Sequence, residues 1–459
     1  MKQRLFLLLV PIFLFISQSC KKMIAIDPPK NQLVTETIFK DSADATGAVV
    51  GIYIRIMTSI TQLNICSGAL TAYTAVASDE MYPNTTNPSL QQFYNNSVST
   101  DNDLNGSLWQ FAYQIIYQAN ACIEGLTQSS TLNTSLRSQL LGEVKFLRAL
   151  LYFNLVNTFG TVPLVISPDY KITASLGRAT LDEIYAQMIV DLTEARQLLS
   201  TDYVLSPKAR PNSYTASALL ARIYLFRQQW TEANTEATRV ITANNYLLEP
   251  NLDNVFLSNS RETIWQLRTV QPSAGTTEAI SFIPVTATRI PNYIITTNII
   301  NSFEPNDNRK SKWIKFTGVI GGQTYPYPFK YKLRSSATSE ESYVVLRLAE
   351  QLLIRAEART HLTDITNAKN DLNAVRNRAG LPNTLATDEQ SLLTAIEQER
   401  KVELFTEWGH RWFDLKRLGK INTVLSVAKA PNWQPTDALF PVPLNEINTN
   451  PFLVQNPGY

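Results

Sequence analysis

The sequence contains little histidine or cysteine for its length. Of 459 residues, only two are histidine and three are cysteine. The histidines, His361 and His410, have no neighbouring cysteine or histidine at metal-ligand spacing, which argues against a metal site. No strained Gly-x-Ser-x-Gly turn marks a serine nucleophile beside them. The sequence therefore predicts no metal site, no cofactor and no nucleophilic catalysis.

The chain also lacks a surplus of either charge. It has 41 Lys and Arg against 39 Asp and Glu, a formal net charge of +2, and we see no long basic run. A protein without a concentrated positive field is poorly suited to neutralise phosphates, so nucleic-acid binding is not expected. With 44% hydrophobic and 17% charged residues, the composition is that of a globular chain with a sizeable core.

Long apolar runs are absent except at the N-terminus. Lys2 and Arg4 precede an apolar run, residues 5–16, and small polar residues then lead to Cys20. This order is typical of a secretory signal, and the run is too short to span a bilayer permanently. Because Cys20 follows the small residues and resembles the acylated cysteine of a bacterial lipobox, we expect a signal peptide over 1–19 and a lipid anchor on Cys20. A plain secretory signal is the alternative.

Two further cysteines, Cys66 and Cys122, lie in a chain that we expect to be exported. Disulfides persist outside the cytoplasm, so the two could pair. A chain of this size does not need a disulfide to stabilise its core, and we favour two small buried apolar side chains. The sequence does not decide between the two.

Apolar periodicity indicates a mainly α fold. After a tether over 20–36, we expect irregular tetratricopeptide-like helix pairs in a bundle with long loops and minor β-structure. The N-terminal helical-repeat region would cover 37–270 and the C-terminal region 271–459, in one compact unit. Thr180 and Glu183 form a capping box. Helices are predicted at 136–159, after Thr180, at 214–229, from 230 onwards, at 343–360 and at 367–379.

The C-terminal end is rich in proline. Pro441, Pro443, Pro451 and Pro457 disfavour regular helix. We expect this segment to run extended over the helices as a clasp.

Residues 399–417 mix acidic and basic side chains on one helix. Glu403 and Glu407 share a face, and two carboxylates across a cleft could serve a glycosidase. Their basic neighbours would keep both ionised, whereas a general acid needs a raised pKa. We therefore predict an ion-pair network that joins this helix to Arg347, Glu350 and Glu357.

Several blocks carry a resemblance that spans nearly the whole chain. Residues 143–164 (EVKFLRALLYFNLVNTFGTVPL), 346–358 (LRLAEQLLIRAEA), 399–417 (ERKVELFTEWGHRWFDLKR) and 440–459, ending in QNPGY, resemble the blocks of the SusD/RagB family, in the family's order. Cys20 followed by Ile26-Asp27-Pro28 resembles the mature start of that family.

The resemblance implies a non-catalytic role. Members of this family are lipid-anchored nutrient-binding proteins of the bacterial outer membrane. They hold an oligosaccharide, or in some cases a peptide, over a SusC-like TonB-dependent transporter. By this resemblance we expect glycan binding, no enzymatic activity, that partner and display on the cell exterior. A peptide-binding member and a helical-repeat protein-interaction scaffold are the alternatives.

The expected binding residues lie in loops rich in Asn, Tyr and Pro. Sugar rings pack on exposed aromatic faces, and their hydroxyls pair with short polar side chains. By resemblance to starch-binding members, we expect ligand contacts from Asp79, Tyr82, Asn84, Phe93, Tyr94, Asn96, Tyr293, Trp313, Tyr325 and Tyr327. For each aromatic residue, packing within its own loop is the alternative, and Asp79 could instead cap a helix.

Overall fold

The computed structural model describes the chain from residue 38 onwards, with the exceptions 59–62, 272 and 339. The expected signal peptide (1–19), the tether (20–36) and the anchor residue Cys20 lie outside the described residues. Over the residues that are described, no helix is both long and apolar enough to cross a membrane.

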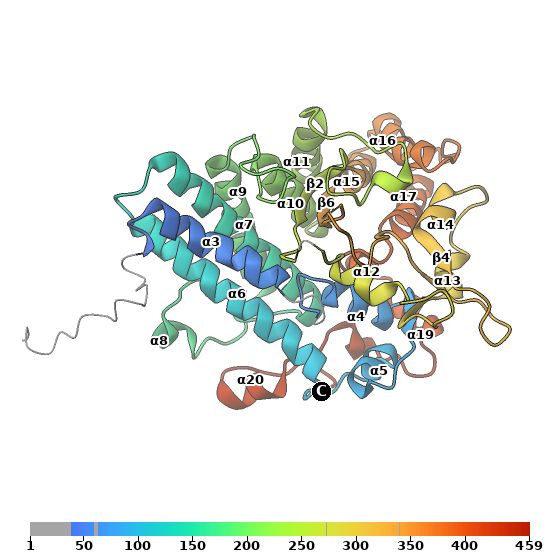
Figure 1. The fold of residues 1–459 in the computed structure, drawn as a ribbon, viewed down its shortest axis with the longest axis horizontal. Helices are drawn as coiled ribbons and strands as arrows, with labels where there is room; N and C mark the ends of the chain where they lie inside the picture. Colours follow the sequence, from blue (N-terminus) through green and yellow to red (C-terminus); the bar gives the residue numbers. More distant parts are fainter. Residues whose placement is uncertain (1–37, 59–62, 272, 339) are drawn as a thin grey trace, which may run out of the picture.

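The predicted mainly helical fold is confirmed. Long helices stack side by side in a curved layer: α6 packs on α7, α7 on α9, α9 on α10, α10 on α11, α11 on α15, and α15 on α16 and α17 (Figure 1). This stacking of successive antiparallel helices is the irregular tetratricopeptide-like arrangement that the sequence predicted. The bounds are α3 Ser42–Met57, α6 Asp103–Gln128, α7 Thr134–Phe159, α9 Leu181–Leu198, α10 Ser213–Phe226, α11 Trp230–Thr242, α15 Leu348–His361, α16 Ile365–Arg378 and α17 Glu389–Glu403.

Local sequence signals set the ends of these helices. The side chain of Asn133 caps α7, and the helix ends at Gly160, whose φ of 78° favours glycine. The capping box of Thr180 and Glu183 is present at the start of α9. Trp230 begins α11 as predicted. These signals act over a few residues, which is why the sequence placed the helices within a few positions.

One predicted helix begins later than expected. The sequence predicted helix from residue 343, but Tyr343–Arg347 is strand β6, which pairs with β2 (Thr263–Leu267), and α15 begins only at Leu348. All five residues of β6 are buried, so the apolar run carries no helical or strand period. Only the pairing with β2, which is distant in the sequence, distinguishes the two structures.

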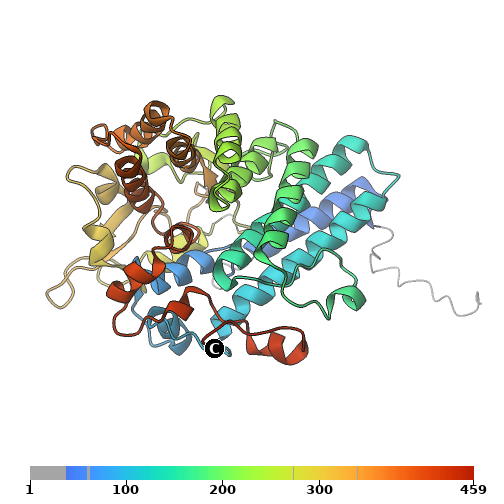
Figure 2. The same ribbon diagram turned by 180° about the vertical axis from the view of Figure 1, so that it is seen from behind.

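Short elements fill the concave side and the far end of the helical layer (Figures 1 and 2). Besides β2 with β6, the strands form two antiparallel pairs, β1 with β3 and β4 with β5. The bounds are α4 Ala69–Ala77, β1 Met81–Pro83, α5 Pro88–Tyr94, α8 Tyr170–Thr173, η2 Leu252–Asn254, α12 Thr277–Phe282, β3 Tyr293–Ile295, α13 Thr297–Ile300, α14 Asn308–Trp313, β4 Ile314–Phe316, β5 Pro326–Pro328, α18 His410–Arg417 and α19 Ile421–Ala428.

The C-terminal segment clasps the helices, but it is not wholly extended. It begins with the 3₁₀ turn η3 (Pro435–Ala438) and contains the helix α20 (Leu444–Thr449). The helix contradicts the expectation that the prolines keep this segment extended. That expectation was wrong because Pro443 stands at the N-cap of α20, where its missing N–H is not needed. The clasp is fixed by Asn456, whose amide donates to the carbonyl oxygen of Phe159 at 2.9 Å and to that of Phe440 at 2.7 Å.

Cys66 and Cys122 are both free and buried. The interpretation as two buried apolar side chains is therefore confirmed. Burial raises the pKa of each thiol to about 12, so neither is a reactive thiolate near neutral pH.

Candidate functional site

The structure divides the expected ligand-contacting residues into a buried and an accessible group. No more than 7% of each buried residue's surface is exposed, and this group consists of Asp79, Phe93, Asn96, Tyr293, Trp313 and Tyr327. The expectation of exposed contact surfaces in these loops was wrong for this group. The loops fold back on the helices, and their aromatic side chains complete the core.

Asp79 is held in a buried ion pair. Both of its carboxylate oxygens accept hydrogen bonds from the guanidinium of Arg411, each at 2.8 Å, and the amide of Asn298 donates at 2.6 Å. Although burial alone would raise the pKa of this carboxyl, the Arg411 hydrogen bonds and charge outweigh burial and lower it. Asp79 therefore joins α4 to α18 rather than facing a ligand.

Trp313 is the largest of the buried aromatic residues. None of its surface is exposed, and its indole N–H donates to the carbonyl oxygen of Leu252 at 3.1 Å. The ammonium of Lys330 lies 4.7 Å from the centroid of its ring. Trp313 therefore packs against buried cations of the core.

The accessible group is Tyr82, Asn84, Tyr94 and Tyr325. Asn84 is exposed, 37% of the Tyr94 surface is exposed, and Tyr82 and Tyr325 are half-buried. Tyr82 lies in the middle of β1, opposite Ile294 of β3. Strand β3 packs beside β5, and Tyr325 directly precedes β5. Tyr94 is the last residue of α5, which packs against β1.

These elements bring three tyrosine side chains together. Partial burial raises the pKa of the Tyr82 phenol, and the nearby phenols of Tyr325 and Tyr94 raise it further. Such an electrostatic effect places the Tyr82 hydroxyl near the hydroxyl of Tyr325 on one side and near that of Tyr94 on the other. We refer to Tyr82, Tyr94 and Tyr325 as the tyrosine surface. It joins two neighbouring N-terminal elements, which carry Tyr82 and Tyr94, to Tyr325, which is more than 200 residues away in the sequence.

Polar groups border the tyrosine surface. The backbone N–H of Asn84 donates to the carbonyl oxygen of Asn292 at 2.8 Å, which places two exposed asparagines side by side at the end of β1. The ammonium of Lys429 lies 4.3 Å from the centroid of the Tyr94 ring and donates to the carbonyl oxygens of Val76, at 2.6 Å, and Tyr94, at 3.3 Å. Burial lowers the pKa of Lys429 to about 7.

Neither Asn292 nor Lys429 was among the residues expected from the sequence to contact the ligand. Asn292 carries the same signal as the chosen residues, since it is an asparagine beside a tyrosine in a polar loop. Lys429 carries no such signal, because only the packing of the C-terminal segment against α4 and α5 brings it to Tyr94. The three tyrosines and the two exposed asparagines together offer flat aromatic faces beside hydrogen-bonding side chains. A sugar ring requires this combination.

The carboxylates that suggested a glycosidase lie in a buried ion-pair network. Glu403 accepts hydrogen bonds from Arg309 at 2.8 Å, from Arg347 at 2.5 Å, and from Arg378. Glu407 accepts from Arg347 at 2.9 and 2.8 Å and from Lys330. Burial opposes ionisation, but the surrounding cations hold the pKa of each carboxyl below its ordinary value.

This arrangement bears out much of the predicted network and corrects two parts of it. Residues 399–417 are not one helix, because α17 ends at Glu403 and α18 begins at His410, with Glu407 in the turn between them. Arg347 and Glu357 are joined to the 399–417 segment, Glu357 through Arg417. Glu350 instead forms its short contacts with Arg222 of α10, at 2.6 and 2.7 Å. Among the described residues, no three His, Cys, Asp or Glu side chains gather as a possible metal site.

Two family descriptions match the chain. The first, "Starch-binding associating with outer membrane", matches residues 49–225, and the second, the SusD family, matches residues 307–459. The two matches lie in the N-terminal and C-terminal parts of the chain, and the tyrosine surface takes residues from the first match and from the second.

Individual relatives are similar over nearly the full length. SusD-like protein P25 of Formosa agariphila is 25% identical over 98% of this chain and 99% of its own, and SusD-like protein P2 of the same organism is 26% identical over 94% and 95%. Among solved structures, a SusD superfamily protein from Bacteroides vulgatus has a TM-score of 0.81 at 20% identity, covering 92% of this chain and 99% of that one. A laminarin-binding SusD-like protein has a TM-score of 0.77 at 26% identity, covering 92% and 100%.

Proposed function

Because the chain belongs to the SusD family, we propose that it captures a glycan at the tyrosine surface and delivers it unchanged to a SusC-like TonB-dependent transporter. The observation that carries this proposal is the convergence of Tyr82, Tyr94 and Tyr325 from separate segments. Three accessible aromatic rings at one place form a platform for successive sugar rings, since each ring contributes apolar contact and a phenol for hydrogen bonding.

The likeness to known proteins supports a glycan as the ligand. A similar solved structure is a laminarin-binding SusD-like protein, and one matching family is described as starch-binding. A β-glucan or an α-glucan is therefore the first choice among ligands. The exposed side chains of Asn84 and Asn292 would supply the polar contacts that distinguish one hydroxyl pattern from another, while the buried Lys429 holds Tyr94 in place.

Capture without catalysis is the form of the proposal that the acidic residues support. A glycosidase needs one carboxyl with a raised pKa and a second that is ionised, both within reach of the substrate. Glu403 and Glu407 are buried, and cations keep both ionised. They stabilise the fold and cannot contact a sugar.

The test is affinity electrophoresis of the full-length chain, purified in mild detergent, through gels that contain laminarin, starch or another polysaccharide. We expect one polysaccharide to retard the wild type, and Tyr82→Ala and Tyr325→Ala to reduce the retardation at least tenfold. Tyr117→Ala is the matched control, because Tyr117 is a tyrosine of α6 with 56% of its surface exposed and is not one of the three residues of the tyrosine surface. Retardation that survives both tyrosine substitutions would contradict the proposed site.

Lipid anchoring at Cys20, display on the cell exterior and the transporter partner belong to the same proposal. The family description that includes association with the outer membrane supports the location. Radiolabelled palmitate should enter the wild type but not Cys20→Ala, and protease added to intact cells should cleave the displayed protein. A tagged full-length chain should co-purify with a barrel transporter, and its absence in repeated mild-detergent preparations would contradict that partner.

A further inference from the structure

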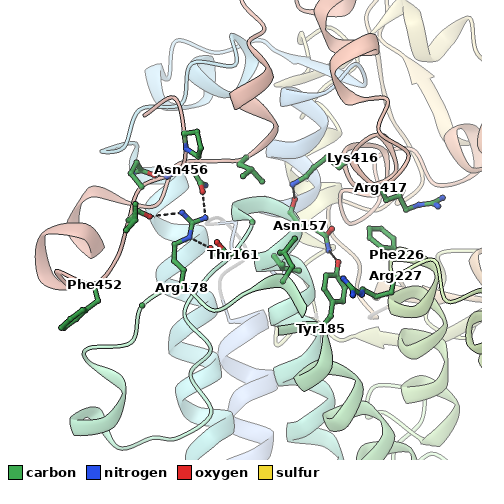
Figure 3. Close-up of a pocket in the computed structure, with 18 residues that line it drawn as sticks. Asn157, Thr161, Arg178, Tyr185, Phe226, Arg227, Lys416, Arg417, Phe452 and Asn456 are labelled. Carbon is green, nitrogen blue, oxygen red and sulfur yellow. Dashed lines mark hydrogen bonds between the residues drawn. The ribbon is translucent and has the colours of Figure 1, made fainter. Parts of the chain in front are cut away.

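A pocket lies outside the tyrosine surface. It has a volume of about 910 Å³ and opens between the C-terminal end of α7, the start of α9, the end of α10, α18 and the C-terminal segment (Figure 3). None of the three tyrosines of the tyrosine surface lines it. The two surfaces can therefore be tested separately.

Four cations line the pocket. Arg178, Arg227, Lys416 and Arg417 contribute to its wall, and neither Asp nor Glu is among the described residues that line it. Two of these cations are neutralised from outside the pocket. Arg227 donates to Asp182 at 2.6 Å, and Arg417 donates to Asp414 at 2.6 Å.

The other two cations contact only neutral oxygens among the described residues. Arg178 donates to the carbonyl oxygens of Thr161, at 2.7 Å, and Val454, at 3.0 Å, and to the side-chain oxygen of Asn456. Lys416 donates to the carbonyl oxygen of Asn157 at 2.6 Å (Figure 3). The pocket thus has two positive charges without a carboxylate partner.

Burial makes this arrangement costly. It lowers the pKa of the Lys416 ammonium to about 7 and also lowers the pKa of Arg178. A cation that is desolvated without an anion destabilises the fold. An anionic group bound in the pocket would remove that cost, so the uncompensated charge favours an anion as ligand.

The remaining wall suits a sugar ring better than a bare ion. Tyr185 and Phe226 supply aromatic surface on one side of the pocket, Phe452 stands at its opposite edge, and Gln455 supplies an amide (Figure 3). The phenol of Tyr185 accepts only a long hydrogen bond, 3.5 Å from the Asn157 amide nitrogen, so its own proton is available to a ligand. A volume of about 910 Å³ is far larger than an inorganic anion needs and is in the range of pockets for small organic ligands.

We propose that this pocket is a binding site for an acidic sugar unit, whose carboxylate or sulfate group pairs with Lys416 or with Arg178 while its ring packs against the aromatic side chains of the wall. Such a site would add selectivity for charged glycans to the capture at the tyrosine surface. The proposal does not depend on the neutral glycan site, because the two surfaces share no residue.

Isothermal titration of the full-length chain in mild detergent tests the proposal. The probes are methyl glucuronide and glucose 6-sulfate, which separate the carboxylate from the sulfate, with methyl glucoside as the neutral control. We expect at least one acidic probe to bind at least tenfold more tightly than the neutral one. Lys416→Met should weaken that binding at least tenfold, and Tyr82→Ala should leave it unchanged.

The matched control is Lys420→Met. Lys420 lies four residues after Lys416, just beyond the end of α18, but it pairs with Glu397 and does not line the pocket. It should bind the acidic probe like the wild type. Because Lys416 is partly exposed and has no carboxylate partner among the described residues, its replacement by methionine should not unfold the protein, and circular dichroism checks this.

Three results would overturn the proposal. They are equal affinity for acidic and neutral glycosides, binding that Lys416→Met leaves unchanged, and an absence of saccharide binding while an acidic peptide of aspartate and glutamate binds. The last result would assign the pocket to a protein segment instead.

Discussion

Asp79 and Arg411 form a buried bidentate ion pair between positions that are 332 residues apart, with both N–O distances at 2.8 Å. Asp79 stands at the end of α4, three residues before Tyr82 of the tyrosine surface. The pair therefore fixes the strand that carries the first tyrosine onto the C-terminal helices. A residue expected to bind ligand instead positions the elements that carry the proposed binding surface.

Removing this ion pair should destabilise the protein and affect binding only indirectly. Breaking one partner of a buried pair costs about 3–5 kcal/mol, because the other charge remains buried. We expect Asp79→Asn to lower the free energy of unfolding by roughly that amount in urea titrations. Asp101→Asn, which changes an exposed aspartate, is the control and should have little effect. If Asp79→Asn left the stability unchanged but abolished glycan retention, Asp79 would have to be returned to the ligand site.

Trp313 and Tyr325 should respond in opposite ways to substitution by alanine. Trp313 is fully buried, and replacing such a tryptophan costs about 3–5 kcal/mol of stability. Tyr325 is half-buried, so Tyr325→Ala should cost less than about 1.5 kcal/mol while reducing polysaccharide retention. Thermal unfolding and affinity electrophoresis of both variants measure the two effects. A Trp313→Ala protein with normal stability would contradict the full burial of the Trp313 side chain.

Glu278 should make the stability depend on pH between about 4.5 and 8. Burial raises the pKa of this carboxyl to about 8, and the Tyr343 hydroxyl, which donates to it at 2.7 Å, only partly opposes that effect. As the pH rises through this window, the unfolded chain releases the Glu278 proton first, while the folded chain retains it. Folding then loses stability with rising pH, by about 1.4 kcal/mol for each unit of pKa difference.

Substitution isolates this effect from the other titrating groups. The free energy of unfolding of wild type minus that of Glu278→Gln should fall between pH 5 and pH 8, because glutamine does not titrate. Glu124→Gln, at an exposed position on α6, should give a constant difference. A constant difference for Glu278→Gln as well would mean that this carboxyl is already ionised at pH 5.

Glycine positions test how closely the helices approach. A Cβ at Gly142 of α7 would lie 2.7 Å from the side chain of Leu199, just beyond α9, whereas one at Gly106 of α6 meets nothing within 4 Å. We expect Gly142→Ala to destabilise the protein by about 1–3 kcal/mol through overpacking. Gly106→Ala should stabilise it by up to about 1 kcal/mol through helix propensity. Urea unfolding measures the stability of both variants. If Gly142→Ala were also stabilising, α7 and Leu199 would lie farther apart than the structure shows.

The helical fold could be predicted from the sequence because the signals that define helices are local. The caps of α7 and α9 and the start of α11 lie within a few residues of the helices they define. The sequence also predicts the ion-pair network around Arg347 and Glu403, since unpaired charges at these positions would oppose burial. Strand β6 was missed because its neighbour β2 is far away in the chain.

The candidate site was predictable only in part. Loop composition indicated segments that include the accessible residues Tyr82, Tyr94 and Tyr325. It could not separate them from Phe93, Trp313 or the other buried residues, because aromatic side chains serve cores and binding surfaces equally well. Lys429 was out of reach, since its contact with Tyr94 arises from the path of the C-terminal segment.

The sequence by itself determined the helical class of the fold, the order of its long helices and, through its blocks, the family. These features depend on short-range periodicity and on residues that are adjacent in the chain. The tertiary structure alone decided which aromatic side chains remain accessible and which two cations, Arg178 and Lys416, lack an acidic partner among the described residues. Burial and charge pairing depend on contacts between distant segments, and those contacts form only when the whole chain has packed.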